Sequence, residues 1–129
     1  MKTNADLSPL FFFERYKWYL KALNSKKAEK SKIIRDIRNG LISRDILDDG
    51  WEERADKDIR RYKRRLRDIE ATIESVPETA QLMPCKIFLR LHFVMGMSLT
   101  EVSEKMNVSL STVRRIKSRT EDYFEKRLS

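Results

Sequence analysis

Residues 109–119 hold the side chains of this sequence that are best suited to recognise a polyanion such as double-stranded DNA. No acidic residue occurs between Val108 and Thr120, whereas arginine and lysine recur there. Arginine can donate two hydrogen bonds to the O6 and N7 atoms of guanine, and both residue types bind phosphate. The side chains that we expect to project toward DNA are Leu110, Ser111, Arg114, Arg115, Lys117, Ser118 and Arg119. The alternative is an ordinary helical hairpin whose charged face is only solvated.

Other reactive residue types occur in isolation. His92 lies between Leu91 and Phe93, and we interpret it as a packed or surface histidine. Cys85 follows Pro84 at an expected helix start, and we interpret it as a small hydrophobic residue. One cysteine and one histidine cannot supply the ligands of a zinc site. We therefore expect no enzymatic activity, no metal and no cofactor.

Composition agrees with binding to a polyanion. The 129 residues include 28 Lys and Arg against 20 Asp and Glu, which gives a net charge of +8. Three glycines and three prolines are too few for the turns of a many-stranded β fold. The single cysteine closes no intrachain disulfide, no apolar run reaches the ~20 residues of a membrane span, and the first ten residues lack a leader pattern. We expect a soluble cytoplasmic protein.

The residues around this cationic segment predict a helix-turn-helix. Ser98 is expected to cap a short helix, with Glu101 completing a capping box. Asn107 stands where that helix must end in a left-handed conformation, and Ser109 is expected to cap the second helix. A small side chain at Ser103 lets the two helices approach. The expected inward-facing residues are Val102, Met106, Val108, Val113, Ile116, Thr120 and Tyr123.

A further helix is expected just before this motif. Pro84 is suited to open it, and Gly96 to end it. Its expected inward residues are Ile87, Leu91 and Val94, broadened by Phe88 and Met95.

The first part of the chain predicts two long helices. The first is expected to begin at Ser8-Pro9 and either to continue as a solvated segment or to break near Asn24-Ser25. Residues 39–40 and 48–50 are the clearest helix breakers. The expected inward face of this first helix consists of Phe13, Tyr16, Leu20 and Leu23, widened by Trp18 and Tyr19.

The second long helix has an apolar seam with heptad spacing. Its members are Ala55, Ile59, Tyr62, Leu66, Ile69, Ile73 and Val76, and Pro77 ends the pattern. The seam must be covered, so we expect residues 10–76 to form a helical hairpin or an intermolecular coiled coil. A basic cluster at residues 60–67 flanks the seam and is either a solvated surface or a phosphate contact.

The stretch from Ile87 to Leu128 resembles region four of bacterial sigma factors, above all in the residues GMSLTEVSEKMNVSLSTVRRIKSRTEDYFEKRL. It is most similar to the sigma-like domains of small phage regulators of Gram-positive bacteria, the RinA and ArpU late-gene and autolysin regulators. Many such turns have glycine where Asn107 stands, and many have alanine where Ser103 stands. The resemblance implies binding near promoters, activation of late, packaging or lysis genes, and contact with RNA polymerase in a bacterial host cell. By position, it also places Thr112 and Arg114 against DNA.

The sequence thus predicts an all-α chain with a helical hairpin or coiled coil for oligomerisation at residues 1–78 and a sigma-like DNA-binding domain at residues 79–129. The hypothesis that we favour is a sequence-specific transcriptional regulator, an activator of phage genes. The alternatives are a small terminase-like subunit for DNA packaging and an interaction module that binds RNA polymerase. Because one helix-turn-helix reads few base pairs, we expect a homodimer or higher homo-oligomer.

Overall fold

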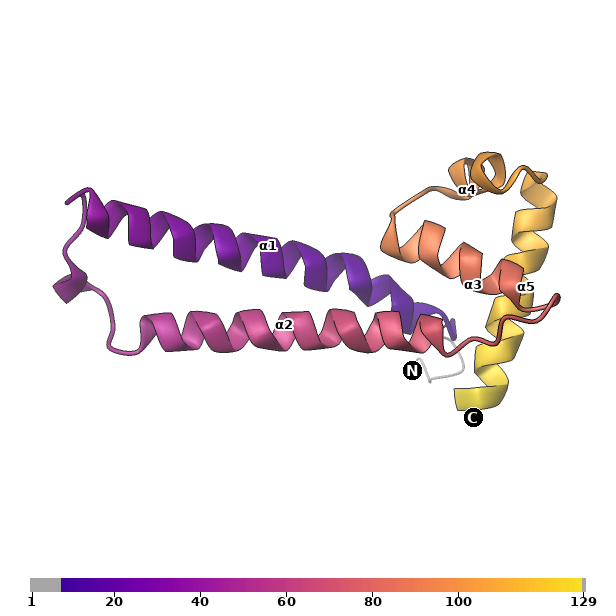
Figure 1. The fold of residues 1–129 in the computed structure, drawn as a ribbon, viewed down its shortest axis with the longest axis horizontal. Coiled ribbons are helices and arrows are strands. Elements are labelled where there is room, and N and C mark those ends of the chain that lie inside the picture. The colour runs from indigo at the N-terminus through magenta and orange to yellow at the C-terminus, as the bar shows by residue number, and fades with distance from the viewer. Residues whose placement is uncertain (1–7, 129) are drawn as a thin grey trace, which may run out of the picture. The chain divides into compact units, whose positions relative to one another are not determined.

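The computed structural model describes residues 8–128, and this part of the chain is helical throughout its regular structure, without strands (Figure 1). The all-α prediction is therefore confirmed. Two compact units are present. The hairpin unit is Trp18–Arg67, and the helix-turn-helix unit combines the residues up to Lys17 with those from Asp68 onward. The expectation about a leader falls on residues 1–10, most of which lie outside the described residues.

Two long helices cross the hairpin unit, α1 (Phe11–Arg38) and α2 (Trp51–Glu74). The helix α1 runs unbroken through Asn24-Ser25, so of the two alternatives the continuous helix is correct. The connection contains a short 3-10 helix, η2 (Arg44–Ile46). Glycines with positive φ values lie at both ends of it, at Gly40 and Gly50, as the breaker pattern predicted. In the described residues no helix is long and apolar enough to cross a membrane.

Ion pairs fix the antiparallel register of the hairpin unit. Lys26 pairs with Asp58 at 3.6 Å, and Lys30, one turn later on α1, pairs with Asp56, which lies earlier on α2. The two helices lie side by side in Figure 1. Along the predicted seam of α2, Ile59 and Tyr62 are half-buried, and the other members, Ala55, Leu66, Ile69, Ile73 and Val76, are buried.

The predicted inward face of α1 is partly wrong. Phe13, Tyr16 and Leu23 are buried, but Leu20 is 38% exposed and Trp18 is 54% exposed. A straight α-helix drifts by ~20° per heptad relative to an exact seven-residue repeat. This drift is too small to expose Leu20, which lies one heptad after the buried Phe13, so the partners packed beside α1 decide which of its side chains are covered.

The helix-turn-helix unit contains α3 (Met83–Leu89), which continues into a π-helical turn η3 (Arg90–Val94), then α4 (Leu99–Met106) and α5 (Leu110–Leu128). Its core includes the start of α1. The Phe13 ring lies 5.0 Å from that of Phe124 and 5.8 Å from that of Phe93, centroid to centroid. Residues that are distant in sequence therefore support the C-terminal helices.

The predicted inward face of α3 is also wrong in part. Ile87 is 39% exposed and Met95 is 60% exposed, whereas Phe88 and Leu91 are buried as expected and Leu89 is buried as well. The π-helical turn ends with a hydrogen bond from the Met95 backbone N–H to the Arg90 carbonyl, 2.9 Å long. Such a turn contains more residues than an α-helical turn, so it changes which side chains face inward.

A buried lysine joins α3 to the end of α2. The Lys86 Nζ atom donates to the Glu74 carbonyl at 3.2 Å and to the Glu78 carboxylate at 3.0 Å. The guanidinium of Arg90 pairs with the Glu74 carboxylate. Because a buried charge is costly unless it is paired, these contacts restrict how α3 can be placed against the α2 terminus.

Candidate nucleic-acid interface

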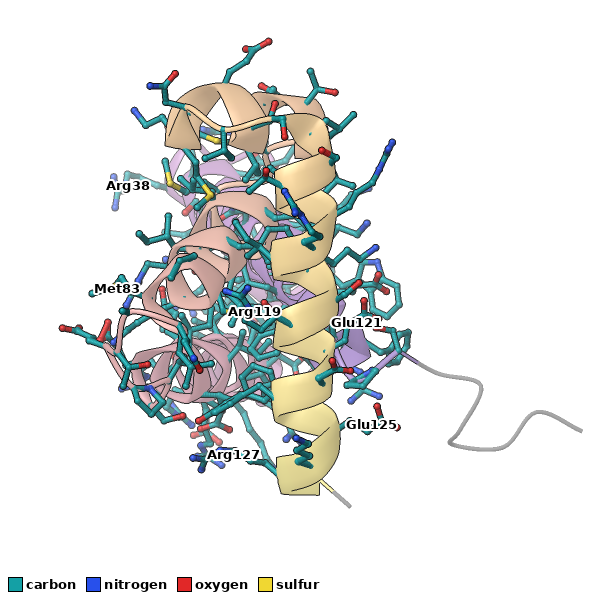
Figure 2. The ribbon with its side chains drawn as sticks, turned by 90° about the vertical axis from the view of Figure 1, so that its right-hand side faces the viewer. Arg38, Met83, Arg119, Glu121, Glu125 and Arg127 are labelled. Carbon is teal, nitrogen blue, oxygen red and sulfur yellow. The ribbon has the colours of Figure 1, made fainter. Side chains whose placement is uncertain are left out.

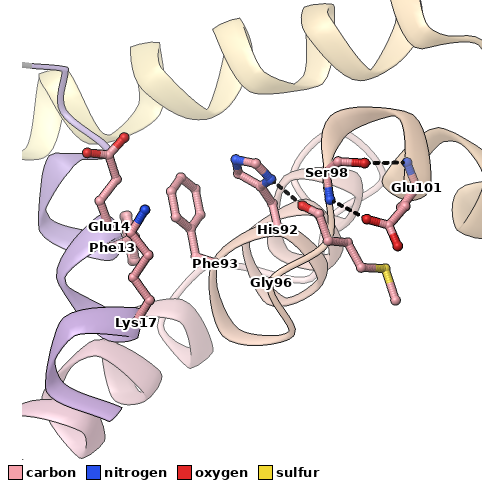
Figure 3. Close-up of a pocket in the computed structure, with 9 residues that line it drawn as sticks. Phe13, Glu14, Lys17, His92, Phe93, Gly96, Ser98 and Glu101 are labelled. Carbon is pink, nitrogen blue, oxygen red and sulfur yellow. Dashed lines mark hydrogen bonds between the residues drawn. The ribbon is translucent and has the colours of Figure 1, made fainter. Parts of the chain in front are cut away.

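The helix α4 begins with the predicted capping box. The Glu101 backbone N–H donates to the Ser98 hydroxyl at 3.1 Å, and the Ser98 backbone N–H donates to the Glu101 carboxylate at 3.0 Å, as Figure 3 shows. The hydrogen bond from the Ser98 backbone holds the pKa of Glu101 below its usual range. The backbone N–H groups of Ser98 and Glu101, which have no partner within the helix, are thus both hydrogen-bonded.

The turn between α4 and α5 has the left-handed residue that the sequence predicted. Asn107 adopts φ 58° and ψ 46°. The Val108 backbone N–H then donates to the Ser103 carbonyl at 3.0 Å, which closes the helix end as a Schellman motif does. The prediction that the Val108 side chain faces inward is wrong, because this side chain is 36% exposed. Backbone hydrogen bonds close the turn instead.

Buried side chains set the relation between α4 and α5. Val102 and Val113 are fully buried, and Ile116 is buried beside them, as predicted. Ser103 is buried too, and its hydroxyl donates to the Thr100 carbonyl at 2.6 Å. Met106 is only half-buried. This core leaves the opposite face of α5 free for a ligand.

Farther along α5, the inward face differs in one residue from the prediction. Thr120 is fully buried and donates its hydroxyl to the Ile116 carbonyl at 2.7 Å. Tyr123 is half-buried, with the Arg127 guanidinium 4.6 Å from its ring centre. The more buried aromatic side chain is Phe124, which the sequence interpretation missed. A four-residue step from Thr120 could have identified it.

Hydroxyl groups organise the first turn of α5. The Ser109 hydroxyl accepts a hydrogen bond from the Thr112 backbone N–H at 3.1 Å, which confirms Ser109 as the cap. It also lies 3.0 Å from the Ser111 hydroxyl and 2.9 Å from the Thr112 hydroxyl. Arg115 donates in turn to the Thr112 hydroxyl at 3.0 Å, so its guanidinium is held over this turn.

The structure brings the predicted interface residues together on the first three turns of α5. Five are exposed, namely Ser111, Arg114, Arg115, Ser118 and Arg119, and three are half-buried, namely Leu110, Thr112 and Lys117. Arg119 donates to the Gln81 carbonyl at 3.2 Å and therefore braces the segment before α3. The sequence gives no signal for this contact, because the two residues are remote from each other. Arg114 forms no ion pair within the described part of the chain.

The acid-free run of cations on α5 ends at Arg119. Glu121, Asp122 and Glu125 follow Arg119. Figure 2 shows Glu121 and Glu125 on one side of α5 and Arg119 on the other. Glu121 accepts a hydrogen bond from the Ser8 hydroxyl at 3.2 Å. The long acid-free run of cations on α5 therefore lies in its N-terminal half.

The pocket drawn in Figure 3 has about 320 Å³ and contains His92, but its geometry gives this histidine a structural role. The Nδ1 atom of His92 lies 2.7 Å from the Met97 carbonyl, and the ring stacks on Phe88. Cys85 is buried, with its Sγ atom 3.9 Å from the Ile116 carbonyl. Among the described residues, no group of histidine, cysteine and acidic side chains is placed to hold a metal ion.

Comparison with known proteins identifies this region. Residues 86–121 match the family model for region 4 of sigma-70. The match runs from α3 through α4 and the cationic half of α5. This part of the chain is therefore a sigma region-four-like helix-turn-helix. A search of curated proteins and a search of solved structures each found no match to the chain.

Proposed function

We propose that the chain is a sequence-specific DNA-binding transcriptional regulator whose α5 lies in the major groove. The observation that carries the proposal is the exposed, acid-free row of cations on the first three turns of α5, within the region that matches the sigma-70 model. Helix-turn-helix proteins place the N-terminal part of their second helix against base edges.

Within this interface we assign Arg114 to base contacts. Its side chain is exposed, and none of the described residues pairs with it, so its planar guanidinium is available to bridge a guanine. Arg115 is already bonded to Thr112, and Arg119 to Gln81, so each has to combine a DNA contact with an internal one. Lys117 is half-buried and suited to a phosphate.

The resemblance to phage late-gene regulators supports a finer proposal, namely activation of late, packaging or lysis genes together with RNA polymerase. The test is selection of the genomic fragments that the purified full chain binds. We expect these fragments to lie beside promoters of such genes. Enrichment at a packaging site would instead favour a packaging subunit, and the absence of any enrichment would contradict sequence-specific binding.

A further inference from the structure

A second cationic surface lies on α2, in the hairpin unit. Lys57, Arg60, Arg64 and Arg67 recur at steps of three, four and three residues, which places them on one face of the helix. All four are exposed, on the side opposite the buried Leu66. We call these four residues the cationic stripe.

In the middle of α2, the acidic side chains pair with α1 and a run of cations follows them. Its acidic residues Asp56 and Asp58 pair with lysines of α1. No acidic residue occurs between Ile59 and Arg67, and within the described part of the chain no carboxylate pairs with any member of the cationic stripe. A solvated helix surface ordinarily mixes both signs in stabilising pairs. Between Lys57 and Arg67 this surface carries cations only, and the acidic residues Glu53 and Asp68 lie on the same face just beyond its two ends.

The dense cations of this segment repel one another at helical spacing. Arg60 and Arg64 are like charges four residues apart, as are Lys63 and Arg67, and such pairs destabilise a helix. A polyanion bound along the stripe would remove this repulsion. The stripe is ~15 Å long at 1.5 Å per residue, which spans about four base-pair steps at 3.4 Å of rise along the DNA axis.

We propose that the cationic stripe of α2 binds the phosphate backbone of double-stranded DNA without regard to base sequence, as a contact separate from that of α5. Three of its four members are arginines, whose fork of donors suits phosphate oxygens. Such contacts add affinity to both specific and non-specific binding but carry no sequence information. The proposal holds whether or not α5 reads bases.

The test uses the full chain with Arg60→Gln, Arg64→Gln and Arg67→Gln combined. Glutamine is a good helix former, so α2 should remain intact, which circular dichroism verifies. The matched control removes three exposed charges from α1 by combining Lys21→Gln, Lys27→Gln and Arg35→Gln. Binding is measured by fluorescence anisotropy on a duplex of random sequence over a range of salt concentrations.

We expect the stripe variant to bind the random duplex about tenfold or more weaker at low salt, with a salt slope reduced by about 2 to 3, at ~0.9 for each phosphate contact. The control should change far less, and replacement of the same three arginines by lysine should largely restore the slope. Equal losses in stripe variant and control would overturn the proposal. Failure of α5 to bind DNA gives a different result, in which Arg114→Ala changes nothing while the stripe variant still weakens binding.

Discussion

At the scale of the residue, substitutions of Arg114 and Lys117 should distinguish contacts with bases from contacts with phosphates. We expect Arg114→Ala to cost about 1–3 kcal/mol of binding to the selected genomic fragment, because a bidentate contact to guanine is lost, and to relax specificity at one base pair. Lys117→Ala should weaken binding to the selected and to a scrambled duplex alike and lower the salt slope by about 1. Fluorescence titrations on both duplexes measure this. Arg127→Ala, beyond the acidic residues of α5, is the control, and parental binding by both site variants would exclude α5 from the groove.

The residues predicted best from the sequence act through their immediate neighbours. Ser98, Glu101 and Asn107 satisfy backbone groups within five positions, so their types and spacing determine their geometry. The contact of Arg119 with the Gln81 carbonyl could not be predicted, because it depends on how α3 and α5 pack. The inward orientation predicted for Val108 is wrong, and its backbone N–H, not its side chain, closes the turn by bonding to the Ser103 carbonyl.

At the scale of the element, the capped start of α4 should contribute measurably to the free energy of unfolding. We expect Ser98→Ala to lower the free energy of unfolding by ~1 kcal/mol, because the Glu101 backbone N–H loses its acceptor. Ser31→Ala, on an exposed interior turn of α1, serves as the control and should cost nothing. Urea unfolding followed by circular dichroism compares them.

The same capping box should respond to acid. The pKa of Glu101 is lowered by the hydrogen bond from the Ser98 backbone. The ionised Glu101 carboxylate therefore adds to the free energy of unfolding at any pH above the ordinary pKa of a glutamate. It should be lost as the pH falls through the lowered pKa of the folded state. A difference between parent and Glu101→Gln that did not change with acidification would contradict this assignment.

A second element-scale prediction concerns the packing of α1 on α2 in the helix-turn-helix unit. The Tyr16 hydroxyl donates to the Glu70 carboxylate at 3.0 Å, and burial, followed by Glu70, raises the pKa of Tyr16 from 10.0 to about 12. We expect Tyr16→Phe to cost ~1 kcal/mol at neutral pH. Since the raised pKa favours the neutral phenol, the advantage of the parent should be complete below pH 10.0 and vanish as the pH approaches 12. Urea unfolding at several pH values tests this, with Tyr19→Phe as the control.

The apolar spacing predicted where the helices form, but it did not predict which side of each helix is buried. The π-helical turn at residues 90–94 shifts the phase of the residues that follow α3, such as the exposed Met95, and no residue type indicates it. In α1 Leu20 is exposed, although its spacing from Tyr16 and Leu23 fits a helix face equally well. Tertiary packing decides between such alternatives.

At the scale of the whole molecule, the core of the helix-turn-helix unit is discontinuous in sequence. Phe13 contributes its buried ring beside Phe124 and Phe93, although it lies far from both in the chain. Heptad spacing and Pro77 led us to place a boundary after residue 78, and this division remains a prediction. Local pattern cannot indicate that the start of α1 supports the C-terminal helices, because only folding brings these rings together.

The last prediction is that the protein is at least a dimer when it binds its operator, since paired half-sites supply the affinity and site length that one helix-turn-helix lacks.

Leu66 is buried within the hairpin unit, so Leu66→Asp should unfold the hairpin. Leu20 is exposed on α1, so Leu20→Asp should leave helicity intact and, if this face joins two copies, weaken association by about 1.5–3 kcal/mol per subunit. Leu41→Asp, in the exposed connection, is the control. Sedimentation of the free and the DNA-bound protein measures the mass of the assembly. If the unsubstituted protein stays monomeric on its operator, paired half-sites are excluded. The α5 helix and the cationic stripe of a single chain then have to supply the affinity.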